Sequence, residues 1–316
     1  MTIDPSPLSF TPLHPTFGAR VDGLDFSKPF PDAVQIELRH ALERYGLLVA
    51  RKTSIDDQSM LALGTSWGEL ENVTAHKKSG LILRIPHDEI FDVGNIDHED
   101  KIITGDNPMR AAALKGNALW HADGGYNPRR SGLSILRAVE LPPPSTGGST
   151  EYLDSRTAYE DLPEETKQRI EGLVGCNSLL WNRQQSSPEM EQFSKVDVLK
   201  AITAKHKLAQ IHEPTGRGNL YVCSYNHHVE GLSIDEGRKL IDELLEHLFQ
   251  DKYKYTVEWE SPGDIAFWDN TAVLHRARIG TYHGKYRRDM RRISTFDDSS
   301  YAYGENQVGS AQFGLA

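Results

Sequence analysis

The sequence predicts a mainly β fold with flanking helices, in which the strands form a closed or sandwiched core. Short apolar or alternating segments recur along the chain and are separated by Gly, Pro, Asn and Asp. Segments with helical periodicity lie beside these strand-rich stretches. They do not alternate one by one with the strands, as the crossover helices of a parallel α/β sheet would.

The N-terminal part is predicted, in order, as an irregular arm (1–16), a short strand (17–26), a helix (31–45), a buried strand (47–50) and a second helix (55–67). The arm is rich in Pro, Ser and Thr. Apolar residues recur at helical spacing in the first helix, and Gly46 ends it. Asp56 and Asp57 are expected in the first turn of the second helix, where the helix dipole favours acidic residues.

Residues 69–115 show little periodicity. The segment 81–85 predicts a strand, and the polar run after it, 88–107, contains the breakers Gly94 and Gly105. A long stretch without a pattern near a candidate site is more typical of a lid or a pocket wall than of a linker.

The rest of the chain predicts strands at 132–138, 150–153, 219–225, 253–259, 265–268 and 291–296, and helices at 154–162, 164–173 and 233–248. Ser233 and Glu236 have the spacing of a capping box at the start of the last helix. The polar segment 178–207 is expected to be a loop with helical pieces. Because no linker is visible, we expect a single domain over residues 1–316, with a C-terminal tail at 298–316.

Composition and charge limit the classes of function. A chain of 316 residues, 38% hydrophobic and 25% charged, can bury a large core. A net charge of −10 argues against binding to nucleic acid or to a membrane surface. Cys176 and Cys223 are far apart, which argues against a disulfide framework or a structural zinc site. No secretory signal or long apolar stretch is visible, so a cytoplasmic protein is expected.

The segment 117–126 contains the first candidate for chemistry, because His121 and Asp123 stand two residues apart. On an extended strand, residues i and i+2 point to the same face, so an imidazole and a carboxylate would converge. With a second histidine from elsewhere, they would form the two-histidine, one-carboxylate face that holds Fe(II) and leaves coordination positions open. A hydrogen-bonded strand end without a metal is the alternative.

His275 is the favoured third ligand. The apolar residues 272–274 lead into it from the predicted strand at 265–268, so it is expected inside the core. His227 and His228 are the rivals, and at most one of them could take part because adjacent strand residues point to opposite faces. A core histidine without a metal is again the alternative.

Four arginines form the second candidate, at Arg287, Arg288, Arg291 and Arg292. They lie in a segment that predicts a strand with one apolar face. Arg288 and Arg292 would share one face of it, and Arg287 and Arg291 the other. An arginine in such a strand is costly unless it meets an anion, and its guanidinium suits a carboxylate. A solvated charge cluster is the alternative.

Four segments stand in order along the chain: Trp120-His121-Ala-Asp123, Leu141-Pro142…Gly147-Gly148-Ser-Thr150…Asp154, Pro262-Gly-Asp…Trp268-Asp-Asn270…His275, and Arg287-Arg288-Asp-Met290-Arg291-Arg292. This order resembles the taurine/2,4-dichlorophenoxyacetate dioxygenase family over residues 17–297. The resemblance implies an oxygenase on a double-stranded β-helix, or jelly roll. Its cofactors would be Fe(II), the cosubstrate 2-oxoglutarate and O2, and it would release succinate and CO2.

The resemblance also implies roles for individual residues. His121, Asp123 and His275 would bind iron. Thr150 and Arg288 would hold the distal carboxylate of 2-oxoglutarate. Residues 280–285 look inserted relative to the family, which leaves Arg287 as a substitute for Arg288. The residues implied at the substrate are Asn117, Tyr225, Arg292 and His76, with Arg292 at the position that holds anionic substrates in taurine-type members.

The expected reaction is therefore oxidation, in the simplest case hydroxylation, of a C–H bond in a small organic acid. Three alternatives stay open: a catalytically idle jelly-roll binding protein, a zinc hydrolase with the same ligands, and an oxygenase of a neutral natural product. The expected partner is an anionic small molecule, and neither nucleic acid nor membrane. A homo-oligomer is compatible with the sequence.

Overall fold

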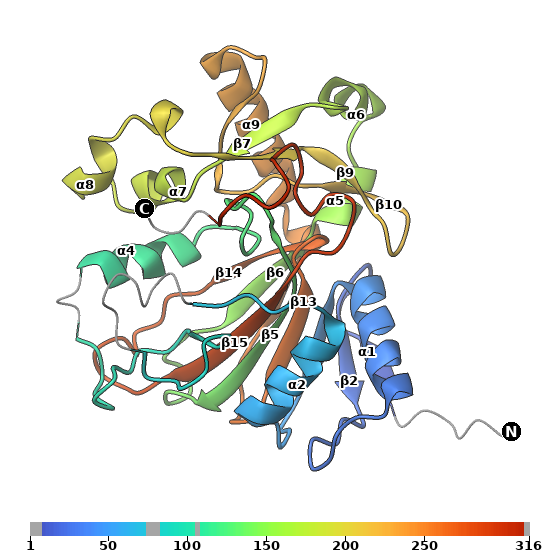
Figure 1. Cartoon of the computed structure of the whole chain (residues 1–316), viewed down its shortest axis with the longest axis vertical. Coiled ribbons are helices and arrows are strands. Elements are labelled where there is room, and N and C mark those ends of the chain that lie inside the picture. The colour runs from blue at the N-terminus through green and yellow to red at the C-terminus, as the bar shows by residue number, and fades with distance from the viewer. Residues whose placement is uncertain (1–7, 74–82, 105–107, 313–316) are drawn as a thin grey trace, which may run out of the picture.

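The computed structural model describes residues 8–73, 83–104 and 108–312 (Figure 1). The strands within these ranges are β1 (Ser9–Pro12), β2 (Ala19–Asp22), β3 (Leu47–Ala50), β4 (Phe91–Asp92), β5 (Ser131–Glu140), β6 (Thr150–Asp154), β7 (Val174–Asn177), β8 (Ala204–Lys207), β9 (Ala209–His212), β10 (Arg217–Leu220), β11 (Asn226–Val229), β12 (Lys254–Val257), β13 (Ile265–Asp269), β14 (Val273–Ala277) and β15 (Asp289–Phe296). The helices are α1 (Asp32–Tyr45), α2 (Asp57–Trp67), α4 (Pro108–Asn117), α5 (Ser155–Glu160), α6 (Glu164–Ile170), α7 (Leu179–Ser186), α8 (Glu191–Ser194) and α9 (Ile234–Leu248), with 3₁₀ turns η1 (Val198–Lys200) and η2 (Asp251–Tyr253).

In the described part of the chain, the strands form four sheets. The largest has the order β1-β2-β3-β13-β5-β15-β4, and a three-stranded sheet has the order β12-β6-β14. The other two are a second three-stranded sheet, β11-β7-β8, and the two-stranded sheet β10-β9. Apart from the parallel pair of β2 and β3, neighbouring strands run antiparallel. The protein is thus a mixed α and β structure built on antiparallel sheets.

The largest sheet is covered on both faces, which explains the continuous apolar sequence of β3. Leu47 and Val49 share a core cluster with residues of β6, β12 and β14, so the three-stranded sheet packs on this face. Leu48 and Ala50 point the other way, into a cluster with residues of α1 and α2. Because side chains alternate along a strand, a strand buried on both sides must be apolar at every position.

Helices cover the outer faces of the two packed sheets. In Figure 1, α1 and α2 lie together against the large sheet, and α9 lies at the other end of the view. Gly46 ends α1 as expected, with φ of 71° and its N–H donating to the carbonyl of Leu42. Ser233 and Glu236 form the capping box that begins α9. Asp56 is the N-cap of α2 and does not lie in its first turn.

The structure corrects several predicted boundaries. Residues 9–12 of the N-terminal arm form β1 and pair with β2, so the arm is not irregular throughout. The strand predicted at 219–225 ends at Leu220, and a new strand, β11, begins at Asn226. Of the strand predicted at 81–85, residues 81–82 lie outside the described ranges, and 83–85 are not in a strand.

Two segments that lack a sequence pattern contain regular structure. The stretch 69–115 includes β4 and most of α4. The polar stretch 178–207 includes α7, α8, η1 and β8, so the expectation of helical pieces is confirmed and the strand is new. Both stretches contribute residues to the candidate site.

No helix among the described residues is long and apolar enough to cross a membrane. Cys176 and Cys223 are both free thiols in the interior.

Candidate metal centre

Three side chains that could bind a metal meet at one point in the core. His121, Asp123 and His275 each offer one ligand atom, and these atoms lie within 4.8 Å of one another. The Oδ1 atom of Asp123 is 4.0 Å from Nε2 of His121, and its Oδ2 atom is 3.7 Å from Nε2 of His275. All three residues are buried. Two imidazoles and one carboxylate suit Fe(II) with open coordination positions.

A main-chain bridge to β14, which carries His275, brings the ligands together, and His121 and Asp123 do not themselves lie on a strand. The N–H of His121 donates to the carbonyl of His275 at 3.0 Å, and the N–H of His275 donates back at 2.8 Å. Residues 123–126 form a turn. The prediction of an extended strand through His121 and Asp123 is therefore wrong. The predicted convergence of their two side chains is nevertheless present.

Asn270 fixes the turn that carries Asp123. Its Oδ1 atom accepts from the N–H of Asp123 at 3.0 Å and from the indole N–H of Trp268 at 2.9 Å. Its amide nitrogen donates to the carbonyl of Gly132 and to Oγ of Ser134, both at 2.9 Å. Four hydrogen bonds on one buried amide hold the carboxylate against the sheet.

The surroundings of the two imidazoles set their orientation. Nδ1 of His121 lies 2.7 Å from the carbonyl of Leu119, which can only accept, so this nitrogen carries the hydrogen and Nε2 is left free as a ligand. The ring of His275 packs against Trp268 and Tyr152, with centroids 4.8 Å and 6.1 Å away.

Burial and neighbouring charges hold the three groups in the protonation states that a metal needs. Burial lowers the pKa of His121, and burial together with the nearby His121 lowers the pKa of His275 to about 3. Burial alone would raise the pKa of Asp123, but Arg292 and the two imidazoles hold it below its usual value. At neutral pH the site offers two neutral imidazoles and a carboxylate, so metal binding need not displace a proton.

A cavity of about 230 Å³ opens beside these ligands, and we call it the metal cavity. Its lining includes two residues implied at the substrate, Asn117 and Tyr225, together with Arg292. Arg292 lies within ion-pair distance of a ligand, since its Nη1 donates to Oδ1 of Asp123 at 2.5 Å. The other residues of the wall are Glu71, Asn72, Phe91, His121, Asp123, Gly124, Tyr126, Asn127, Leu179, Arg183, Phe296 and Gln312.

Arg288 contacts the chain at Gly148, two residues before Thr150, and neither Arg288 nor Thr150 lines the metal cavity. The Nη2 atom of Arg288 donates to the carbonyl of Gly148 at 3.0 Å, and Thr150 begins β6 two residues later. Oγ of Thr150 accepts from the indole N–H of Trp259 at 3.1 Å, so its own hydrogen stays available to donate. Arg288 is 8% exposed.

Arg287 has a different environment from Arg288. Its guanidinium is about one-third exposed and pairs with Glu140 at 2.9 Å and with Asp100 at 2.8 Å. Among the described residues, no carboxylate forms an ion pair with Arg288. Arg287 is therefore already paired with two carboxylates, whereas Arg288 has no carboxylate partner among the described residues and is the better placed of the two to bind an anion.

The remaining candidates do not join the centre. His227 and His228 lie on β11, where their Nδ1 atoms are 2.7 Å apart, and they are not in the wall of the metal cavity. His76 lies outside the described residues. Sequence reasoning missed Glu71 and Arg183, which both line the cavity. Each comes from a segment without periodicity. The only sequence signal for either residue was its charge, which does not by itself indicate a place in the site.

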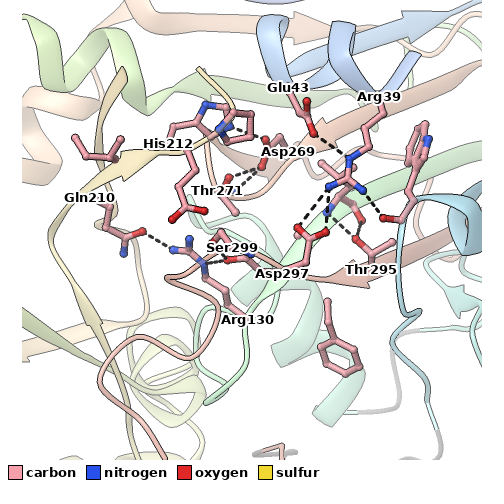
Figure 2. Close-up of a pocket in the computed structure, with 18 residues that line it drawn as sticks. Arg39, Glu43, Arg130, Gln210, His212, Asp269, Thr271, Thr295, Asp297 and Ser299 are labelled. Atoms are coloured by element: carbon pink, nitrogen blue, oxygen red, sulfur yellow. Dashed lines mark hydrogen bonds and ion pairs between the residues drawn. The ribbon is translucent and has the colours of Figure 1, made fainter. Parts of the chain in front are cut away.

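A second polar cavity, of about 210 Å³, is shown in Figure 2, and we call it the paired cavity. Arg130 donates to Asp297 at 2.8 Å, and His212 lies 2.9 Å from Asp269. Arg39 pairs with Glu43 at 2.9 Å and with Asp298 at 3.1 Å. Arg130, Arg39 and His212 each have a carboxylate partner within the cavity wall (Figure 2).

Comparisons with known proteins agree with this geometry. The family described as "Taurine catabolism dioxygenase TauD, TfdA family" matches residues 9–294. The chain is 31% identical over 285 residues to the alpha-ketoglutarate-dependent 2,4-dichlorophenoxyacetate dioxygenase of Burkholderia sp. (strain RASC), which covers 90% of this chain and 92% of that protein. It is 26% identical over 294 residues to the alpha-ketoglutarate-dependent sulfate ester dioxygenase of Pseudomonas putida, covering 91% of this chain and 89% of that protein.

The crystal structure of AAD-2 in complex with Mn(II) and N-oxalylglycine has a similar fold, with a TM-score of 0.79 and 29% identity over 93% of this chain and 98% of that one. The matched range 9–294 contains His121, Asp123 and His275. The antiparallel sheets match those of the jelly-roll proteins of this group. The chain therefore belongs to the taurine catabolism dioxygenase TauD/TfdA family, and it is a non-haem dioxygenase that depends on Fe(II) and 2-oxoglutarate.

Proposed function

We propose that this protein oxidises a C–H bond of a small organic acid, and that residues 1–316 form one catalytic domain on a double-stranded β-helix. One oxygen atom of O2 would enter the C–H bond. The other would enter 2-oxoglutarate, which loses CO2 and becomes succinate. The observation that carries the proposal is the metal cavity, which is small, lies beside the ligands and contains arginine side chains.

In this proposal, His121, Asp123 and His275 hold the iron, which supplies the activation of O2. The chain's own contribution is to fix these ligands before the metal arrives. The main-chain bridge between the two histidines and the Asn270 network around Asp123 leave the site little to reorganise. Such preorganisation keeps the reacting groups in position.

Arg288 and Thr150 are proposed to bind the distal carboxylate of 2-oxoglutarate. Burial lowers the pKa of Arg288, because the interior disfavours a cation that has no carboxylate beside it. A carboxylate would offset this cost through a charge-assisted hydrogen bond, and the free hydroxyl hydrogen of Thr150 would add a second donor. Arg287 does not compete, since two acids already hold it at the surface.

The walls of the metal cavity favour a small acid that carries an apolar or aromatic part. Phe91, Tyr126, Tyr225 and Phe296 supply rings, and Tyr126 and Tyr225 meet edge to face at 5.0 Å. The related proteins named above carry 2,4-dichlorophenoxyacetate and sulfate ester in their names. Asn117, Tyr225 and Arg292 are proposed to contact the substrate, and Arg292 also donates to Asp123.

The experiment is a substrate screen with the Fe(II)-loaded protein, 2-oxoglutarate and O2. The panel would contain aryloxyacetates, short alkyl carboxylates, alkyl sulfates and the neutral amides of the same acids. We expect succinate formation and O2 uptake that both depend on an acid. Succinate formed only with a neutral compound would contradict the acid as substrate, and hydrolysis without O2 uptake would contradict the reaction class. A metal-binding protein without turnover would form no succinate with any compound.

A further inference from the structure

Arg183 is a second buried cation beside the metal centre. It lies on α7, is 6% exposed, and lines the metal cavity together with His121 and Asp123. Among the described residues, no carboxylate pairs with it. Its Nη1 atom donates to Oδ1 of the neighbouring Asn182 at 2.5 Å. This amide oxygen is a neutral acceptor.

The surroundings hold the Arg183 guanidinium in one place. The amide nitrogen of Asn182 donates to Oγ of Ser224 at 2.8 Å and to the carbonyl of Gly116 at 3.3 Å, so the acceptor of the Arg183 hydrogen bond is itself fixed. Gly116 on α4 makes the room, because a Cβ at this position would overlap Nη1 of Arg183. Helix α7, Gly116 and the amide of Asn182 together fix the position of the Arg183 side chain in the interior. Such support is typical of a binding residue.

The two arginines of the metal cavity differ in their partners. Arg292 holds the carboxylate of Asp123. Arg183 instead shares the wall of the metal cavity with the phenol groups of Tyr126 and Tyr225. Burial raises the pKa of Tyr126 to about 12, so this phenol is neutral and supplies no counter-charge. An uncompensated cation in the interior is unfavourable unless a ligand supplies the counter-charge.

We propose that Arg183 binds the anionic group of the substrate, a carboxylate or a sulfate, while Arg292 stays with Asp123. This inference rests on the proposed function, since it requires that the substrate be an acid. The guanidinium would donate hydrogen bonds to two oxygens of the anion. The carbon skeleton of the substrate would extend along Tyr126 and Tyr225 toward the metal ligands.

The test measures the preference for an anion in binding and in turnover. Phenoxyacetate, phenoxyacetamide and an alkyl sulfate would be titrated into protein loaded with Mn(II) and 2-oxoglutarate under anaerobic conditions, for the native chain, Arg183→Gln, Gly116→Ala and Arg292→Gln. We expect Arg183→Gln to weaken binding of the acids by about ten- to a hundredfold and to leave the amide unchanged. Gly116→Ala should act in the same direction, because it displaces the guanidinium without removing it.

Arg169→Gln is the matched control, since Arg169 pairs with Glu243 on an exposed face and should leave every constant unchanged. Circular dichroism checks that each variant is folded, and affinity for 2-oxoglutarate should stay at the native value. If Arg183→Gln and Gly116→Ala keep the native preference for acids, or if Arg292→Gln alone loses it, the inference is overturned. A native protein that binds neither acid overturns it as well.

The same samples separate this inference from the function on which it rests. Substrate-dependent succinate with an acid, combined with an unchanged acid preference in Arg183→Gln, leaves the proposed function standing and removes only the role of Arg183. Absence of succinate with every acid in the native protein removes the proposed function itself. Weakening confined to phenoxyacetate, or confined to the alkyl sulfate, identifies which oxyanion the site takes.

Discussion

The metal cavity and the paired cavity have similar volumes and both contain arginine and histidine, but they differ in how charge is matched. In the paired cavity, Arg130 and His212 each lie within hydrogen-bond distance of a carboxylate, Asp297 and Asp269 respectively (Figure 2). In the metal cavity, Asp123 pairs with Arg292, but Arg183 has only the neutral amide of Asn182 as a partner among the described residues. A cavity whose charges cancel internally serves the fold, and a cavity with charges left over is suited to a ligand.

The largest expected effect is the loss of the metal. His275→Ala removes one of three ligands, so stoichiometric Fe(II) binding and turnover should both fall below detection. The matched control is His212→Ala in the paired cavity, which should still bind one Fe(II). Anaerobic equilibrium dialysis measures both. Native activity in His275→Ala would show that another group completes the site.

The next largest effect is on stability. Asp297→Asn leaves the buried Arg130 without its carboxylate, and breaking a buried pair costs roughly 3–5 kcal/mol in the free energy of unfolding. Arg183→Gln removes a buried cation that has no carboxylate partner, so it should cost far less or stabilise the protein without ligands. Urea unfolding of both variants tests the comparison directly. Equal losses would mean that the two cavities do not differ in charge matching.

A smaller effect separates two neighbours in the sequence. Arg288→Ala should weaken the affinity for 2-oxoglutarate by about 1.5–3 kcal/mol, the value of a hydrogen bond to a charged group. Arg287→Ala removes an exposed pair and should leave the same constant nearly unchanged. Titration of 2-oxoglutarate into the Mn(II)-loaded variants gives both numbers. The opposite order would assign the anchor to Arg287.

The smallest effect concerns Glu71 in the metal cavity. Burial raises the pKa of this carboxyl from 4.5 to about 7, although Ser131 donates to it at 2.5 Å and Arg292 lies nearby. Because the folded-state pKa is raised, its contribution to stability is fully present below pH 4.5 and is lost as the pH rises through about 7. Glu71→Gln should therefore stabilise the metal-free protein by on the order of 1–2 kcal/mol at pH 8 and have little effect at pH 5. A gain of equal size at both pH values would contradict this cause.

The elements that the sequence predicts correctly are those whose evidence is local. The helices α1 and α9 have apolar residues on one face and recognisable ends at Gly46 and Ser233, and the strands β3 and β13 are short apolar segments. Helix α4 was missed, because only Ala112 and Gly116 on it are buried and its apolar period is weak. Its Pro at the first position and its run of alanines were signals that could have been used.

The same distinction applies to the site. The pattern His121-x-Asp123 and the approach to His275 are visible in the sequence, so the metal ligands could be proposed from it. The place of Arg183 could not, because Gly116, Asn182 and Tyr225, which define it, come from three segments whose proximity depends on the whole fold. His76 lies outside the described residues, so its role stays a prediction.

The hydrogen-bonded bridge between His121 and His275 has a consequence for folding. These residues belong to distant parts of the sequence, and joining them closes a long loop whose entropic cost must be met by contacts elsewhere. We therefore expect the ligands to come together only after the strands between them have assembled. A metal ion that needs all three groups binds the native state and not the unfolded chain. Its binding therefore shifts the folding equilibrium toward the native state by mass action.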